Sequence, residues 1–157
     1  MRALVQRVRE AHVAIDGIVQ SRIGMGYVIL LGIREGDTPE DANFLAEKCA
    51  RLRVLGDRDG KMNLALGDVG GSALVVSQFT LYGDVQRGNR PGFSDAARPE
   101  GAEPLYRAFV ARMREMLGTD KVATGEFGAM MEVLIANDGP VSILIESPIP
   151  PTKARNA

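Results

Sequence analysis

Ala73-Leu74-Val75-Val76-Ser77-Gln78-Phe79-Thr80-Leu81 decides the fold of this chain, because it joins an apolar run directly to a polar break. The run is short and rich in branched side chains, which is typical of a buried strand. Where such a strand leaves the core, hydroxyls, amides and backbone groups can meet a ligand without loss of packing. We therefore expect a strand over residues 73–79 with a ligand at its far end.

A second polar break interrupts an apolar run near the C-terminus, at Asn137-Asp138-Gly139-Pro140-Val141-Ser142. Each break has an ordinary explanation. Ser77 and Thr80 can satisfy backbone groups at a strand end, and Gly139-Pro140 can form a tight turn. The two breaks occur together with Arg87-Gly88-Asn89-Arg90-Pro91-Gly92-Phe93, and this combination favours a function.

Length and composition indicate one ordinary globular domain. The chain has 157 residues, 45% hydrophobic and 25% charged, which suits a single domain over residues 1–147. We expect residues 148–157, with three prolines and two basic residues, to form a disordered tail. The net charge of −1 argues against wide coating of nucleic-acid backbone, which needs a dense basic surface. Contact with a short nucleic-acid end is still compatible with this charge.

The sequence favours a cytoplasmic protein that does not enter a membrane. Cys49 is the only cysteine, so an intrachain disulfide is impossible. The first seven residues carry charges too early for a signal peptide, and no apolar stretch reaches membrane-spanning length.

The hydrophobic pattern predicts an α+β fold: a mixed, mainly antiparallel β sheet or barrel with two principal helices. Thr38 and Pro39 are typical of a helix start, and the first helix is expected to end near Arg53. The second helix is expected to carry Leu105, Phe109, Met113 and Met116 on one face and to end at Gly118, after a long connection over residues 83–104. Strands are expected over residues 3–8, 13–15, 18–19, 27–31, 62–66, 73–79, 122–124, 130–136 and 141–146.

The sequence gives little support for a metal site or for a Ser-His-Asp catalytic triad. His12 is the only histidine, so with Cys49 it cannot complete a zinc site, and we expect no metal and no cofactor. Ser77 or Thr80 would become a nucleophile only if His12 approached as a base. Ser77 also lacks the Gly-x-Ser-x-Gly elbow, and a surface or strand-edge role for His12 is favoured.

The two breaks resemble the paired signatures of the D-aminoacyl-tRNA deacylases, the D-Tyr-tRNA deacylase family. The resemblance covers nearly the whole chain, and further segments fall in the family's order: residues 1–8, Gly60-Lys61-Met62-Asn63, Gly70-Gly71-Ser72 and Arg90-Pro91-x-Phe93. It implies a homodimeric, barrel-like fold. It also implies hydrolysis of the ester that links a D-amino acid to the 3′-terminal adenosine of tRNA.

The resemblance also implies roles for individual residues. Gly139 and Pro140 would form a cis peptide that enters the neighbouring subunit's pocket, with their carbonyls facing the substrate α-amino group. Arg7 would brace this element. The adenosine and ester end would be lined by Ser77, Gln78, Phe79 and Thr80. We add three candidate substrate contacts from the motifs and their flanks: Asn137, Met131 and Phe93.

Stiff backbone carbonyls can select chirality by leaving no room for an L side chain. Glycine has no side chain to exclude, so glycyl-tRNA mischarged on tRNA-Ala would also be accepted. The terminal ribose 2′-hydroxyl can assist catalysis, while backbone N–H groups near Phe79 and Thr80 stabilise the oxyanion. Three alternatives stay open: Thr80 as a covalent nucleophile, a non-catalytic RNA-end or nucleotide-binding module, and a His12-dependent esterase.

The chain departs from the family pattern at two positions. Ser142 stands where the family usually has Thr, which preserves the hydroxyl. Gly92 stands where Ser is common, which removes any side-chain role at that position.

Overall fold

The computed structural model describes residues 1–148, so the tail predicted for residues 148–157 lies outside the described residues apart from Pro148. The strands are β1 (Arg2–Ile15), β2 (Ile18–Ile23), β3 (Gly26–Gly32), β4 (Leu55–Gly56), β5 (Met62–Leu64), β6 (Ser72–Ser77), β7 (Val122–Thr124) and β8 (Glu132–Glu146). The helices are α1 (Pro39–Arg51), α2 (Leu66–Val69) and α3 (Pro99–Leu117), with short 3-10 helices η1 (Phe79–Tyr82) and η2 (Thr119–Lys121).

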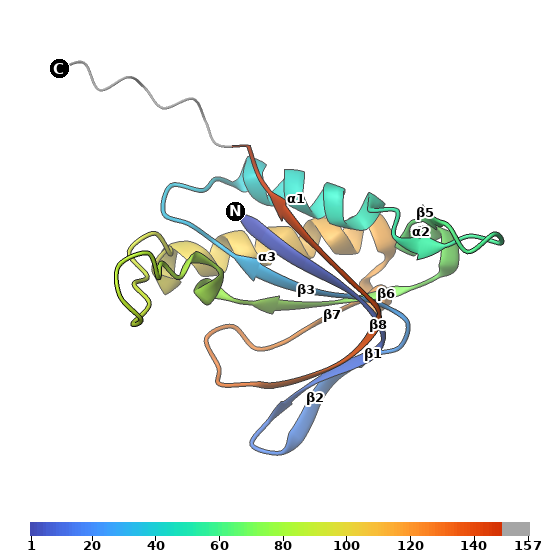
Figure 1. The fold of residues 1–157 in the computed structure, drawn as a ribbon, viewed down its shortest axis with the longest axis horizontal. Coiled ribbons are helices and arrows are strands. Elements are labelled where there is room, and N and C mark those ends of the chain that lie inside the picture. The colour runs from blue at the N-terminus through green and yellow to red at the C-terminus, as the bar shows by residue number, and fades with distance from the viewer. Residues whose placement is uncertain (149–157) are drawn as a thin grey trace.

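The main sheet is organised around β1. Its strand order is β2-β1-β3-β6-β7, and β8 pairs with β1 along almost its whole length. The pairs that involve β1 are antiparallel, whereas β3, β6 and β7 run parallel. Figure 1 shows α1 and α3 packed side by side over one face of the strongly curved sheet. The predicted α+β, barrel-like fold with two principal helices is confirmed.

The start of α1 follows from local chemistry. Thr38 Oγ1 accepts a hydrogen bond from Asp41 N at 3.3 Å, and Asp41 Oδ2 accepts one from Thr38 N at 2.8 Å. This reciprocal capping box satisfies donors that the first helical turn leaves free. Leu45 and Cys49 then face the core and are fully buried.

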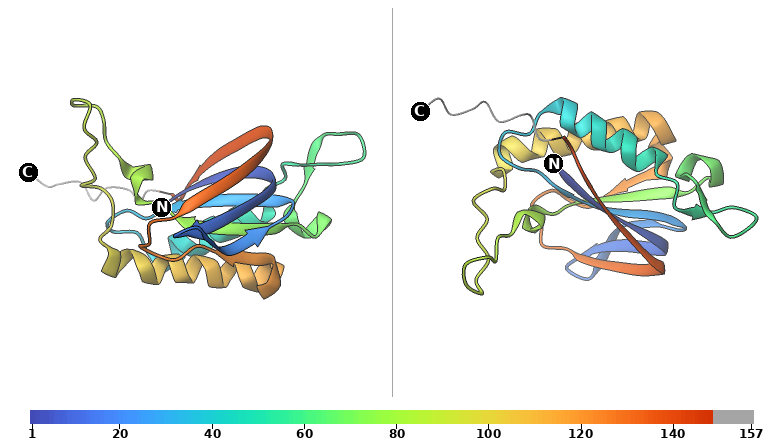
Figure 2. Two further views of the ribbon diagram at one scale, coloured as in Figure 1. Left: turned by 90° about the horizontal axis from the view of Figure 1, so that it is seen from below. Right: turned by 45° about the horizontal axis from the view of Figure 1, so that its top comes forward.

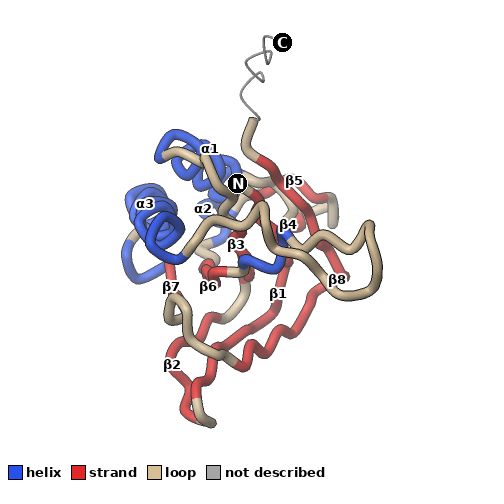
Figure 3. Tube along the Cα trace, turned by 90° about the vertical axis from the view of Figure 1, so that its left-hand side faces the viewer, coloured by secondary structure: helices blue, strands red, loops and turns tan. Residues whose placement is uncertain are grey.

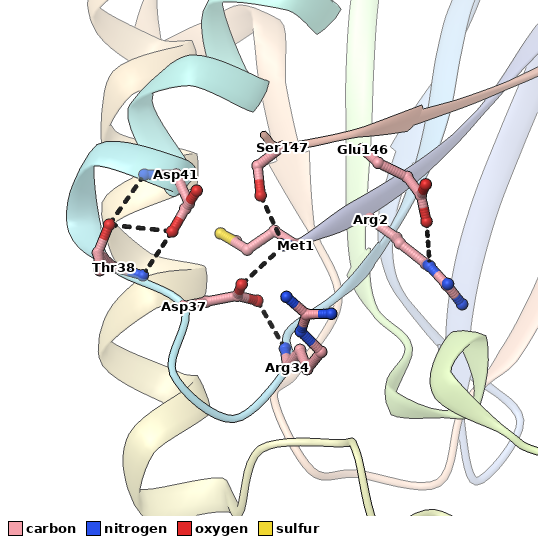
Figure 4. Close-up of polar contacts among 8 residues, drawn as sticks. All are labelled: Met1, Arg2, Arg34, Asp37, Thr38, Asp41, Glu146 and Ser147. Carbon is pink, nitrogen blue, oxygen red and sulfur yellow. Dashed lines mark hydrogen bonds and ion pairs between the residues drawn. The ribbon is translucent and has the colours of Figure 1, made fainter. Parts of the chain in front are cut away.

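A polar cluster ties the start of β1 to the end of β8 (Figure 4). The Met1 ammonium donates hydrogen bonds to Asp37 Oδ1 and Ser147 Oγ, both at 2.8 Å. Asp37 Oδ2 also accepts from Arg34 N at 2.6 Å. These groups are largely buried, so each charge and donor has a partner, as burial requires. The cluster fixes the loop before α1 against both strands.

Two pairs of predicted strands each form one continuous strand, β1 and β8. The break expected between residues 8 and 13 is absent, because β1 absorbs the irregular sequence as register shifts against β8 at Gln6/Val8 and Val8/Glu10. Residues 130–136 and 141–146 were predicted as separate strands, but β8 is continuous through the polar break at 137–140. The strand predicted over 73–79 ends at Ser77, and η1 begins two residues later at Phe79.

The long connection is shorter than predicted, because α3 begins at Pro99 and contains Pro104. Proline inside a helix removes one backbone hydrogen bond. Burial of Ala102 and Tyr106 on either side of it offsets that loss. The remaining connection, residues 83–98, is braced by isolated bridges at Asp84/Gly92 and Arg34/Ala96. Among residues 1–148, no helix is long and apolar enough to cross a membrane.

All of the chain's tyrosines, Tyr27, Tyr82 and Tyr106, are buried. The Tyr27 hydroxyl donates to Leu52 O and the Tyr106 hydroxyl to Val75 O, each at 2.9 Å. Burial disfavours the charged phenolate and raises the pKa of each tyrosine to about 12.

These tyrosines predict a loss of stability in strong base. Unfolded tyrosines titrate near pH 10, so between about pH 10 and about pH 12 the folded state retains protons that the unfolded state releases. The contribution to stability is complete below about pH 10 and falls as the pH rises through that window. Tyrosinate absorbance and urea unfolding across this range check the prediction. Half-ionisation near pH 10 in a protein that is still folded would contradict it.

Candidate active site

The first polar break lies where β6 ends. Ser77 pairs with Leu31 of β3, and Gln78 N extends the ladder by donating to Leu31 O at 2.8 Å. The chain then turns into η1. Gly32 permits this turn, because a Cβ at that position would lie 3.0 Å from Leu81 Cβ and 3.2 Å from Gln78 O. The sequence thus delivers residues 77–80 to the open end of the sheet.

The groups presented there suit an ester with a developing negative charge. The Phe79 side chain is 54% exposed, and Gln78 Nε2 donates to Thr80 Oγ1. The N–H groups of Phe79 and Thr80 begin η1, so they have no partner within the helix. Free N–H groups at a helix start can stabilise an oxyanion. The Phe79 and Phe93 rings meet edge to face at 5.1 Å and form an apolar wall beside them.

Met131 reaches the same end of the sheet through the segment that follows β7. Gly125 N donates to Val75 O at 3.1 Å, which holds this segment against β6. A Cβ at Gly125 would lie 2.6 Å from Met131 Sδ, so Met131 covers Gly125 closely. Met131 is partly buried in the apolar cluster that contains Val76. The structure therefore gathers Ser77, Gln78, Phe79, Thr80, Phe93 and Met131 at one end.

The second polar break forms a rigid element around Arg7 of β1. Arg7 Nε donates to Asp138 O at 3.0 Å, and Arg7 Nη1 donates to Val54 O at 2.7 Å. Arg7 Nε also lies 3.4 Å from Asp138 Oδ2. Gly139 has φ +127°, and a Cβ there would lie 3.1 Å from Arg7 Nη2, so a side chain would disturb this clamp. The Gly139–Pro140 peptide is cis, both residues are exposed, and the exposed Asn137 pairs with Val8 just before them.

The two groups of residues are far apart within one protomer. Ser77 aligns through Leu31 with Ala3 of β1, whereas Gly139 and Pro140 lie in β8 between the levels of Gln6 and Val8, beside Arg7. Four residues of strand separate Ala3 from Arg7, which corresponds to about 13 Å. Figure 1 shows the same separation, with β6 pointing away from the bend in β8. A single protomer therefore does not assemble all the predicted site residues.

His12 does not approach Ser77 or Thr80. It lies on β1, paired with Arg22 and Leu134, nine residues beyond the level of Ser77. His12 is partly buried in a strand that is paired on both sides, so the prediction of a surface or strand-edge histidine is wrong. A Ser-His pair is not formed within the protomer. In the described part of the chain, no group of three or more His, Cys, Asp or Glu side chains converges.

Two contributors were missed from the sequence. Val54 acts through its backbone carbonyl, which any residue type would supply, so no sequence signal could have identified it. Gly125 leaves room for the Met131 side chain to pack against it. The absence of a side chain at position 125 was the only feature of the sequence that could have indicated this contact. Both lie outside the polar breaks that drew attention to residues 77–80 and 137–142.

Comparison with known proteins gives consistent matches along the chain. The model of a family described as D-Tyr-tRNA(Tyr) deacylase matches residues 4–146. A D-aminoacyl-tRNA deacylase from Chloroflexus aurantiacus is 57% identical over 147 residues, covering 94% of this chain and 91% of the relative. Its counterpart from Symbiobacterium thermophilum is 58% identical, covering 94% of this chain and 96% of the relative.

Solved structures share the fold. A c-Myc DNA unwinding element binding protein superposes with a TM-score of 0.91 at 41% identity, covering 95% of this chain and 100% of the other. A protein described as a probable eukaryotic D-amino acid tRNA deacylase superposes with a TM-score of 0.80, covering 92% of this chain and 98% of the other. Its identity of 16% limits this second likeness to the fold.

The hydrogen bonds of Arg7 predict that it contributes more to the free energy of unfolding than the nearby Arg9 does. Arg7→Gln removes charged donors from two carbonyls and should lower the free energy of unfolding by about 2 kcal/mol. Arg9→Gln is the matched control, because Arg9 is 79% exposed and reaches Asp138 only through a 3.6 Å ion pair. Its cost should stay below about 0.5 kcal/mol. Urea unfolding measures both values, and equal costs would refute the clamp.

Proposed function

This chain belongs to the D-Tyr-tRNA(Tyr) deacylase family, and from that premise we propose that it hydrolyses the ester of D-aminoacyl-tRNA and releases the D-amino acid and tRNA. The observation that carries this conclusion is the family match over residues 4–146, together with relatives above 50% identity named D-aminoacyl-tRNA deacylase. The protein is therefore an enzyme of the hydrolase class. Its reaction removes D-amino acids from tRNA before they reach translation.

We assign the reacting ester and the 3′-terminal adenosine to the end of β6. The N–H groups of Phe79 and Thr80 lie at the start of η1, where they can stabilise the oxyanion of a tetrahedral intermediate. The edge-to-face rings of Phe79 and Phe93 offer an apolar surface to the adenine. Ser77 and Met131 complete the walls on either side.

The attacking group in this proposal is water, assisted by the 2′-hydroxyl of the terminal ribose. The protomer supplies no base for Thr80, because His12 is remote and Thr80 Oγ1 already accepts from Gln78 Nε2. A covalent mechanism through Thr80 would need a proton acceptor beside its hydroxyl. Positioning and oxyanion stabilisation are sufficient to accelerate ester hydrolysis.

Selection for D-amino acids is assigned to the carbonyls of Gly139 and Pro140. Arg7 holds the preceding carbonyl, that of Asp138, so this backbone has little freedom to move aside. A carbonyl fixed against the Cα substituents of the substrate excludes an L side chain but makes no demand on a D side chain. Glycine has nothing to exclude, so we also propose hydrolysis of glycyl-tRNA.

This assignment requires a second copy of the chain, because residues 77–80 and 139–140 are far apart in one protomer. We propose a homodimer in which each Gly139–Pro140 element completes the other protomer's site. The long strand β8 favours such pairing, because within residues 1–148 its only strand partner is β1, and it exposes Leu134 and Leu144 at 44% and 55%. A two-fold axis would then form two equivalent sites.

We place the enzyme in the cytoplasm, where aminoacyl-tRNA is used. The fully buried Cys49 needs no oxidising compartment. A non-catalytic RNA-end module is the remaining alternative, and it differs by binding a D-aminoacyl-adenosine analogue without cleaving an ester. With a net charge of −1, the chain lacks the dense positive charge expected of a protein that binds duplex nucleic acid non-specifically.

The proposed stereochemistry predicts a clear difference between matched substrates. D-Tyr-tRNA and glycyl-tRNA should lose their amino acid, whereas L-Tyr-tRNA should survive, with rates differing by at least about 100-fold. Release of radiolabelled amino acid at equal enzyme concentration measures this. Equal decay of the D and L esters would exclude chiral selection, and no decay of any ester would favour the binding module.

Thr80→Ala separates the RNA-assisted mechanism from the covalent one. If the 2′-hydroxyl assists water, the variant should keep activity within about tenfold of wild type, because the backbone N–H groups remain. Single-turnover kinetics on D-Tyr-tRNA measure the rate. Complete loss with an unchanged circular dichroism spectrum would favour a Thr80 acyl intermediate.

A further inference from the structure

A cleft of about 490 Å³ lies between α3 and the segment that follows β7. Tyr106, Arg107 and Arg114 line it from α3, and Gly125, Glu126 and Phe127 line it from the facing segment. It adjoins the proposed active site, because Gly125 both lines the cleft and contacts Met131 of that site. A Cβ at Gly125 would lie 2.6 Å from Met131 Sδ and 3.8 Å from Val76 Cγ2. Figure 3 looks onto this end, where α3, the end of β6 and η1 lie close together.

The cleft offers groups of both charges. Arg114 and Glu126 form no ion pair with any described residue. Arg114 Nη2 donates to Val122 O at 3.3 Å, whereas Arg114 Nε is buried without a hydrogen-bond partner. Arg107 is already paired with Glu103, with Nη2 at 2.7 Å from Oε1. Arg114 therefore keeps donors beyond the one that Val122 O accepts, and Glu126 supplies an acceptor at the same cleft.

The cleft also has an aromatic wall. The Phe127 ring lies 5.6 Å from the Tyr106 ring, centroid to centroid, and the two are tilted. The Tyr106 hydroxyl is fixed by its bond to Val75 O, so this wall is anchored to β6. Aromatic side chains of this kind are the usual stacking surface for an unpaired RNA base.

We propose that this cleft binds the base of the cytidine that precedes the terminal adenosine in tRNA. The inference rests on the proposed function, which places the adenosine on the other side of Gly125 and Met131. Cytosine carries a donor, its N4 amino group, beside the acceptors N3 and O2. Glu126 is suited to accept from N4, Arg114 to donate to the acceptors, and Phe127 to contact the ring face.

A base fits this lining better than a phosphate does. Two arginines and two glutamates line the cleft, so its net charge is close to zero and carboxylates would face a phosphate. Uracil fits less well than cytosine, because its O4 would meet the Glu126 carboxylate as a second acceptor. The cleft therefore predicts a preference for cytidine over uridine at this position.

The test uses the intact protein and three short substrates: D-tyrosyl esters of adenosine, of the dinucleotide CpA and of the dinucleotide UpA. The value of kcat/KM for the CpA ester should exceed those for the adenosine and UpA esters by about five- to tenfold. Glu126→Gln should abolish the preference for CpA over UpA and leave turnover of the adenosine ester unchanged. Glu115→Gln, on another face of α3, is the matched control and should retain the preference.

Each outcome separates this inference from the proposed function. Equal rates on all three esters would overturn the cytidine subsite while leaving the deacylase intact. If no ester is cleaved, binding of uncharged CpA and UpA, followed through the NMR signals of the Phe127 ring, still decides the inference. Tighter binding of CpA that Glu126→Gln removes would support it, and equal binding would refute it.

Discussion

The interaction on which the structure depends is the pair of hydrogen bonds that the Arg7 guanidinium donates to two backbone carbonyls. Arg7 comes from β1, the strand that pairs with β2, β3 and β8, so its position is set by the centre of the sheet. Its guanidinium joins Asp138 O on β8 to Val54 O just before β4. Hydrogen bonds from a charged donor are stronger than neutral ones, and this one is largely shielded from water. The adjacent Gly139–Pro140 backbone is thereby held in place, as the proposed selection for D-amino acids requires.

The proposed mechanism relies on backbone groups in place of the usual catalytic side chains. The lone histidine lies on a distant part of β1, and the lone cysteine is fully buried, with its pKa raised to about 12 by desolvation. The groups that remain are N–H donors at the start of η1 and carbonyls in β8. Because these groups belong to the main chain, they are held by the sheet. In the proposed mechanism, charged substrate groups would meet preorganised dipoles, which cost little reorganisation.

Much of this fold could be predicted from local sequence. The predictions that were wrong concern features that depend on packing and pairing between distant parts of the chain. Thr38, Pro39 and Asp41 predict the start of α1 because capping is a local interaction. Pro104 misled the prediction, since burial of its neighbours in α3 outweighs a lost hydrogen bond. The polar residues 77–80 and 139–140 were predicted as site residues from their pattern, and that assignment stays a prediction. Their separation within the protomer depends on the pairing register of β1, β3, β6 and β8, which is a long-range property that no local pattern encodes.

The central claim, that each site combines two protomers, is tested most directly by subunit complementation. Thr80→Trp places a bulky ring in the first turn of η1, and Gly139→Val disturbs the Arg7 clamp, so each variant alone should be inactive. After the two are unfolded together and refolded at equal amounts, about half the dimers would be mixed, each with one intact site. D-Tyr-tRNA hydrolysis should then recover to about one quarter of the wild-type rate. Failure to recover, with mixed dimers demonstrated by mass spectrometry, would contradict a shared site.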